Sequence, residues 1–191
     1  VHKHKVETVH AFKPADLEVI EKMIAAKINS PRTSSVGRLF DAVASIIGLR
    51  QIAAFEGQAA MDLEFAISHI RTDESYRFEI SSDGNGPVVV DWRPAVSEVI
   101  ADFRSGISAA VISARFHNML AETVVKIAEH SGLRSVAISG GCFQNKYLLE
   151  RTVQRLAEAG FNPYWHQRVP TNDGGIALGQ TLASDMAAAS V

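Results

Sequence analysis

Two glycine pairs, each lying where a short apolar run gives way to a helical pattern, are the features of this sequence best suited to chemistry. The first pair, Gly140 and Gly141, lies in the stretch SVAISGGCFQNKYLLER, residues 135–151. Because glycine has no β-carbon, the backbone there can approach a ligand closely, and the helix that follows offers unpaired N–H groups to an anion. The pair could cradle a phosphate, support a nucleophile at Cys142, or simply form a tight turn.

The residues that follow this pair narrow these alternatives. No Gly-Lys-Ser/Thr motif follows, so the turn is not a P-loop. A helix N-terminus can lower the pKa of a thiol, but no partner for Cys142 can be argued from the spacing, and we interpret it as a small buried filler. Asn145 lies one helical step further on, where it could contact a ligand or cap the first turn.

The second pair, Gly174 and Gly175, lies in the stretch TNDGG just before the last predicted helix. Asp173 could ligate a hard metal ion or a magnesium–phosphate group, or it could cap the helix. Both pairs follow predicted parallel strands, whose carboxyl ends meet at one edge of a sheet and are the usual ligand position. Together the two turns favour a phosphate or nucleotide site over two unrelated turns.

Two further stretches place a carboxylate near a glycine. In GRLFDA, Asp41 lies within an otherwise apolar helix, four residues after Gly37. Its carboxylate needs a partner, either a pair of ribose hydroxyls or the neighbouring Arg38. In FEGQAA, Glu56 suits a helix start electrostatically, and Gly57 again permits close approach of a ligand.

The histidine and cysteine content predicts no metal cluster. The chain has seven histidines and one cysteine, which excludes an internal disulfide and a zinc finger. His117 lies on a long apolar helix, where we interpret it as a hydrogen-bonded core residue. We therefore assign no histidine as a metal ligand.

The hydrophobic pattern predicts an α/β fold with a mainly helical segment over residues 1–74 and a mixed sheet with helices over 75–191. SSDGNG between two β-rich runs indicates a hairpin, and Val88 to Val90 predicts a strand buried on both faces. A strand–helix–strand–helix order near the end predicts a parallel pair. The predicted helices cover 14–29, 36–48, 56–70, 95–104, 108–130, 143–159 and 176–188, and the predicted strands 75–80, 87–92, 135–139 and 161–166.

Composition excludes several classes of protein. Nineteen basic and 21 acidic residues give a net charge of −2, which provides no general attraction for nucleic acid or an anionic membrane. No apolar segment reaches the length of about 20 residues that a membrane span needs. The beginning, VHKHKVETVH, lacks the apolar core of a signal peptide and an initiator methionine. We expect a cytoplasmic chain that is a piece of a longer protein.

Five stretches in order resemble the HypF carbamoyltransferases of nickel–iron hydrogenase maturation: SSVGRLFDAVASIIGL, FEGQAAMDLE, ARFHNMLA, AISGGCFQNKYLLE and VPTNDGGIALGQ. The resemblance covers roughly residues 31–183 and points to the C-terminal lobe of their ASKHA-type domain, an actin/hexokinase-like α/β fold. It implies that carbamoyl phosphate and ATP give carbamoyl-adenylate. The carbamoyl group then passes to the C-terminal cysteine of a maturation partner.

The resemblance also implies roles for individual residues. Asp41 would hold the ribose, and Gly37 and Gly57 would lie against the nucleotide. The remaining implied roles are phosphate contacts by Gly140 and Gly141, a position beside the nucleoside for Asn145, and a divalent metal (Mg, Fe or Zn) on Asp173.

Some family features have no match here: the histidine-rich metal motif, the acylphosphatase-like region and the zinc fingers. We therefore expect that this chain cannot catalyse the complete reaction alone. Two alternatives stay open: a related carbamoyl or threonylcarbamoyl transferase lobe with a tRNA or small-molecule acceptor, and a non-catalytic nucleotide-binding domain. Nucleic acid as a partner is not favoured by the net charge.

Overall fold

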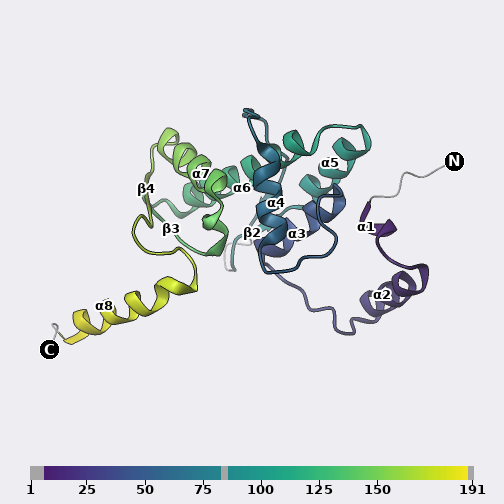
Figure 1. Cartoon of the computed structure of the whole chain (residues 1–191). Coiled ribbons are helices and arrows are strands. Elements are labelled where there is room, and N and C mark those ends of the chain that lie inside the picture. The colour runs from purple at the N-terminus through teal and green to yellow at the C-terminus, as the bar shows by residue number, and fades with distance from the viewer. Residues whose placement is uncertain (1–6, 83–85, 189–191) are drawn as a thin grey trace. The chain divides into compact units, whose positions relative to one another are not determined.

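A computed structural model describes residues 7–82 and 86–188, and its contacts divide the chain into two compact units after Met119. We describe each unit by itself (Figure 1). The two units are defined only by which residues contact one another. The assignment of residues 1–191 to a single lobe therefore stays a prediction. No helix in the described ranges is both long and apolar enough to cross a membrane.

The first unit is mainly helical. Its helices are packed through α3, which contacts both α4 and α5. Strands β1 and β2 form an antiparallel pair in which Ile80 faces Val90. The elements are α1 (Glu7–His10), α2 (Pro14–Ala26), α3 (Val36–Ile46), α4 (Gln58–Ile67), β1 (Glu79–Ser81), β2 (Val89–Asp91), α5 (Arg93–Arg104) and the first part of α6 (Ala109–Ser131).

The core of the first unit lies against one face of α3, where apolar residues recur every three to four positions. Leu39, Val43 and Ile47 are among its buried residues, as their helical spacing predicts. Phe40 packs its ring edge against Phe116, with ring centroids 5.0 Å apart. This burial fixes one face of α3 and leaves the opposite face to solvent.

The second unit is a parallel strand pair with a helical crossover. Ser135 pairs with Asn162 and Ile138 with Trp165, as a strand–helix–strand unit requires. Figure 1 shows β3 and β4 side by side near α7. The elements after α6 are β3 (Ser135–Ile138), the 3₁₀ turn η1 (Gly141–Gln144), α7 (Lys146–Glu158), β4 (Asn162–Trp165), the 3₁₀ turn η2 (Asp173–Gly175) and α8 (Ile176–Ala188).

A small apolar cluster holds the second unit together. Val125, Ala128, Ile138 and Leu156 are buried in it, from α6, β3 and α7. Arg155 of α7 also forms an ion pair with Glu122 of α6. These contacts fix the strand ends from which the glycine turns extend.

The α/β class is confirmed, while the strands among the described residues form two separate two-stranded sheets. The prediction that Val88 to Val90 is buried on both faces is wrong: Val89 is 54% exposed. A continuous β-branched run is typical of a strand covered on both faces, but the face of the β1–β2 pair that carries Val89 is open to solvent.

Candidate functional site

A shallow hollow of about 400 Å³ lies in the first unit, between one turn of α3 and the loop that precedes α4. From α3 it is lined by Arg38 and Asp41, and from the loop by residues 53–57, which include Phe55, Glu56 and Gly57. The hollow is open to solvent on one side. It brings together segments that are separated by more than ten residues in the sequence.

The ion pair on α3 supplies two of the charged side chains that line this hollow. Ser35 caps the helix by accepting a hydrogen bond from the Arg38 backbone N–H at 3.4 Å. One turn later the Arg38 guanidinium lies 2.9 Å from Asp41 Oδ2, and the two side chains are 57% and 36% exposed. Arg38 is therefore a partner for Asp41, as the sequence allowed, and the carboxylate still lies at the surface of the hollow.

The loop before α4 is held at both of its ends. The Ala54 backbone N–H donates to Gln58 Oε1 at 2.7 Å, and Arg50 Nε donates to Asp62 Oδ2 at 2.6 Å. Gly57 adopts a φ of +81°, a left-handed conformation that strains other residues. This glycine is therefore needed for the turn that starts α4, whether or not a ligand approaches it.

Of the predicted residues in the first unit, Asp41 and Gly57 lie together at this hollow, whereas Gly37 is not among the described residues that line it. A β-carbon at Gly37 would make only an ordinary contact of 3.6 Å with Ser35 Oγ. Phe55 was not singled out by the sequence analysis, although an aromatic residue directly before a Glu-Gly turn is a signal that could have found it. It is 54% exposed.

The carboxyl edge of the parallel pair carries both glycine turns in the second unit. The Gly140 backbone N–H donates to Thr171 O at 2.8 Å, which joins the loop after β3 to the loop after β4. Gly140 adopts a φ of +106°, so this turn requires glycine. The prediction that the two turns share one edge is confirmed by this contact.

A serine–histidine pair lies at the same edge and was missed from sequence. Ser139 Oγ and His166 Nε2 are 3.0 Å apart, one residue after each strand. Their distance in the sequence is 27 positions. Only the parallel register of the two strands brings them together.

Asn145 and Cys142, which follow the first glycine pair, each had two possible roles in the sequence. The Asn145 side-chain oxygen accepts a hydrogen bond from the Leu148 N–H at 2.8 Å, and this residue is buried. It therefore caps α7, and its predicted place beside a nucleoside stays a prediction. Cys142 is partly buried rather than fully buried as a core filler would be, and this burial raises the pKa of its thiol, which disfavours a thiolate nucleophile.

Asp173 begins the turn η2 and is exposed. The capping oxygen belongs to Asn172, whose Oδ1 accepts from the Gly174 N–H at 3.1 Å. Gly175 packs so closely that an added β-carbon would lie 2.7 Å from Pro170 O. Within residues 7–82 and 86–188 no three His, Cys, Asp or Glu side chains are placed to hold a metal ion. Asp173 thus offers a single carboxylate, and its role as a metal ligand stays a prediction.

His117 is a core residue, as the sequence predicts. Its Nδ1 lies 2.8 Å from Ser113 O, and its ring packs edge-on against Phe40 with centroids 5.3 Å apart. Burial lowers the pKa of His117 to about 4, against the smaller opposing effect of the hydrogen bond to Ser113. The imidazole is neutral at physiological pH and is not positioned at the hollow.

Residues 2–180 match the family described as carbamoyltransferase, Kae1-like domain, second subdomain. The chain belongs to the HypF carbamoyltransferase family. It is 44% identical over 154 residues to carbamoyltransferase HypF of Synechocystis sp., covering 81% of this chain and 20% of that protein. It is 36% identical over 163 residues to carbamoyltransferase HypF of Rhizobium leguminosarum bv. viciae, covering 83% of this chain and 20% of that protein.

The HypF fold is also found among solved structures. A structure of full-length HypF in the phosphate- and nucleotide-bound form matches with a TM-score of 0.83 and 40% identity, over 91% of this chain and 23% of that chain. HypF of T. kodakarensis matches with a TM-score of 0.72 and 26% identity, over 92% of this chain and 23% of that chain. The chain thus spans about a fifth of the length of the two HypF relatives named above.

Proposed function

We propose that this chain supplies a nucleotide-binding part of a HypF carbamoyltransferase, which binds ATP and the carbamoyl-adenylate made from it and carbamoyl phosphate. The carbamoyl group then passes to the C-terminal cysteine of a hydrogenase-maturation partner. Family membership and the relatives named carbamoyltransferase support this proposal. So does the nucleotide- and phosphate-bound HypF structure. A cytoplasmic location is part of the proposal, because the acceptor thiol must stay reduced.

The observation that carries the proposal is the hollow of the first unit, where Asp41 and Gly57 lie together. A carboxylate is a strong acceptor for two neighbouring hydroxyl donors, which a ribose provides. The turn at Gly57 presents backbone without a side chain. The exposed Asp41 carboxylate can therefore accept hydrogen bonds from a ribose diol while it stays beside Arg38.

In this proposal the second unit has phosphate contacts of its own, at Gly140 and Gly141. Its strand-end turn at Gly140 and Gly141 is free of side-chain bulk, since a β-carbon on either residue would meet no atom within 4 Å. In this proposal Asn145, which also caps α7, lies beside the nucleoside. Asp173 would contribute one carboxylate to a divalent metal, whose chemistry is charge neutralisation at the phosphates.

The proposed transfer depends mainly on holding the carbamoyl carbon in reach of the partner's thiolate. The thiolate sulfur of the partner attacks the carbamoyl carbon, the bond from that carbon to the adenylate oxygen breaks, and AMP leaves with the electron pair. Holding the nucleotide by its ribose on Asp41 fixes the carbamoyl carbon in a defined place for this attack. No side chain of this chain is assigned as a nucleophile or base.

A calorimetric titration of the chain with ATP tests the proposal, comparing the native protein with Asp41→Ala. Because hydrogen bonds to a charged group contribute about 1.5–3 kcal/mol, we expect binding to weaken about 10- to 100-fold. Asp185→Ala on α8 is a matched control, since it also removes an exposed helical aspartate. Absence of ATP binding by the native chain, or equal binding by Asp41→Ala, would contradict the assignment.

Weaker ATP binding by Asp41→Ala is informative only if the variant is still folded. The Arg38–Asp41 pair is exposed at 57% and 36%, and such pairs contribute about 0–1 kcal/mol to folding. Alanine is also the better helix former at this position. We therefore expect the free energy of unfolding of the variant to stay within about 1 kcal/mol of native.

A further inference from the structure

We propose that Ser139 and His166 form a nucleophile–base dyad, which takes up a small acyl or carbamoyl group from an activated oxygen ester. The two residues lie directly after β3 and β4, with Ser139 Oγ 3.0 Å from His166 Nε2. This distance lies within the hydrogen-bond reach of about 2.6–3.2 Å that a nucleophile and its base require. The transfer to the maturation partner uses the partner's thiolate as nucleophile, so this activity is additional to the proposed function.

The backbone holds the dyad in place on both sides. Before it, Ile138 pairs with Trp165 in the parallel register, so the next residue of each strand reaches the same level of the sheet edge. After it, the Gly140 N–H donates to Thr171 O at 2.8 Å and ties the two following loops together. Main-chain hydrogen bonds therefore fix the positions from which the two side chains meet, which favours a persistent reactive geometry.

The nucleophile lies on a sharp turn between a strand and a helix. Ser139 follows β3 and precedes Gly140, whose φ of +106° turns the chain before η1 and α7. A tight turn directly after a strand also exposes the nucleophilic serine of α/β-hydrolases. The likeness is one of geometry alone, because the residues around Ser139 are Ile-Ser-Gly and not Gly-x-Ser-x-Gly.

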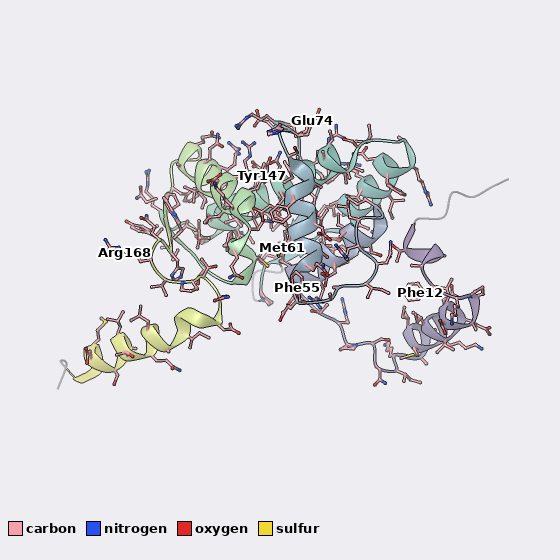
Figure 2. All side chains as sticks on the ribbon, viewed as in Figure 1. Phe12, Phe55, Met61, Glu74, Tyr147 and Arg168 are labelled. Atoms are coloured by element: carbon pink, nitrogen blue, oxygen red, sulfur yellow. The ribbon has the colours of Figure 1, made fainter. Side chains whose placement is uncertain are left out.

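A small substrate can reach both side chains. Ser139 and His166 are exposed, and a β-carbon added at Gly140 or Gly141 would meet no atom within 4 Å. The turn beside the serine is thus open. Figure 2 shows Arg168, which is also exposed, on the loop that follows His166. Open space beside the serine and solvent along this loop suit a small acyl donor.

Acyl transfer to Ser139 needs no group beyond the dyad and the ester. With its hydrogen on Nδ1, the His166 ring accepts the Ser139 hydroxyl hydrogen bond at Nε2. Ser139 Oγ attacks the carbonyl carbon while Nε2 takes the hydroxyl proton, and the bond from that carbon to the ester oxygen breaks. The ester oxygen leaves with the electron pair and receives the proton from His166. The product is an acyl- or carbamoyl-serine, which water then hydrolyses.

The dyad restricts the substrate to esters with a good leaving group. Within the described parts of the chain His166 forms no ion pair with a carboxylate, and its hydrogen-bond partner is Ser139. In serine hydrolases a carboxylate on the other ring nitrogen orients the imidazole and stabilises its protonated form. Because the dyad has no such support, we expect it to act on activated esters and not on amides.

The test uses the whole 191-residue chain with p-nitrophenyl acetate as the probe. We expect a burst of about one nitrophenolate per chain and then slower turnover, because acylation of the serine precedes its hydrolysis. Tryptic cleavage after Arg134 and Lys146 yields a peptide of residues 135–146. Mass spectrometry of this peptide should find one acetyl group, and its fragments should place the group on Ser139.

Variants of the two residues separate catalysis from a structural contact. Ser139→Ala should abolish the burst, and His166→Gln should slow it about 100-fold, which is the lower end of what a positioned base contributes. Glutamine can still accept a hydrogen bond from Ser139 but cannot take its proton, so a purely structural pair would not lose this factor. Ser135→Ala and His130→Gln are matched controls, because they change exposed residues of the same types outside the dyad. Both should keep the native burst.

Three results would overturn the inference. The native chain could show no burst, the burst could persist in Ser139→Ala, or His166→Gln could react as fast as the native chain. An acetyl group found on Cys142 or Lys146 in place of Ser139 would count against it in the same way. These outcomes leave the proposed function untouched, since the calorimetric titration with ATP tests that separately.

Discussion

The buried histidine of the first unit, His117, should lower the free energy of unfolding of this protein as the pH falls from about 7.5 to 5. Burial lowers the pKa of His117 to about 4 in the folded chain, whereas an exposed histidine has a pKa of about 6.5. Above about pH 6.5 both states are neutral and His117 contributes no pH dependence. As the pH falls below this value, the unfolded chain takes up a proton that the folded chain cannot accept, and the free energy of unfolding decreases.

The size of the effect follows from these two pKa values. Between about pH 7.5 and pH 5, proton uptake by the unfolded state alone lowers the free energy of unfolding by about 2 kcal/mol. The loss reaches about 3 kcal/mol at pH 4 and levels off at about 3.4 kcal/mol at lower pH, where both states are protonated. For a domain stabilised by about 5–15 kcal/mol, this is a large fraction.

Urea denaturation at several pH values between about 5 and 7.5 measures this dependence. In His117→Gln the contribution of this residue to the pH dependence of the free energy of unfolding should disappear. The test holds even if the variant is less stable at every pH, because it compares changes with pH rather than absolute stabilities. His69→Gln removes an exposed histidine and should keep the native slope. NMR titration of the His117 ring should show no protonation down to about pH 5.

Two results would refute the reasoning. If the native chain loses no stability over this pH range, the imidazole is not held neutral by burial. If His117→Gln keeps the native slope, another group carries the pH dependence. Either outcome would mean that the contacts of His117 with Phe40 and Ser113 do not persist in solution.

Two further predictions concern the turn before α8. Gly175→Ala would place a β-carbon 2.7 Å from Pro170 O, so we expect a loss of about 1–3 kcal/mol and faster hydrogen exchange in this turn. Gly179→Ala meets no atom within 4 Å and should instead stabilise α8 by up to about 1 kcal/mol; similar effects of the two changes would contradict this. Asp173→Asn should abolish the tightening of ATP binding by Mg²⁺, Fe²⁺ or Zn²⁺ in calorimetry, and unchanged metal dependence would count against its ligand role.

The sequence predicted elements best where local signals agree. The last helix is observed over Ile176–Ala188, as predicted, because a glycine turn precedes it and no breaker follows. The third helix was expected from residue 56 and is observed from Gln58, because Gly57 takes the left-handed conformation before it. The exposure of Val89 could not be predicted, since it depends on which other elements pack over each face of the β1–β2 pair.

The site was predicted in part. Asp41 was identified because a carboxylate within an apolar helix needs a partner, and its neighbour Arg38 was correctly named as one. Phe55 was missed, although its place directly before the Glu-Gly turn was a usable signal. The pair Ser139 and His166 was missed because the two lie far apart in the chain and only strand register joins them.

The sequence by itself determined the element types, the two glycine turns and their common strand edge, because these depend on local backbone preferences and on the handedness of a parallel crossover. Only the tertiary structure decided which residues line the hollow. Packing of α3 against α4 brings the loop at residues 53–57 beside Asp41 and leaves Gly37 outside. Such a surface arises from burial of the opposite helix faces, and burial is a property of the whole fold rather than of any one segment.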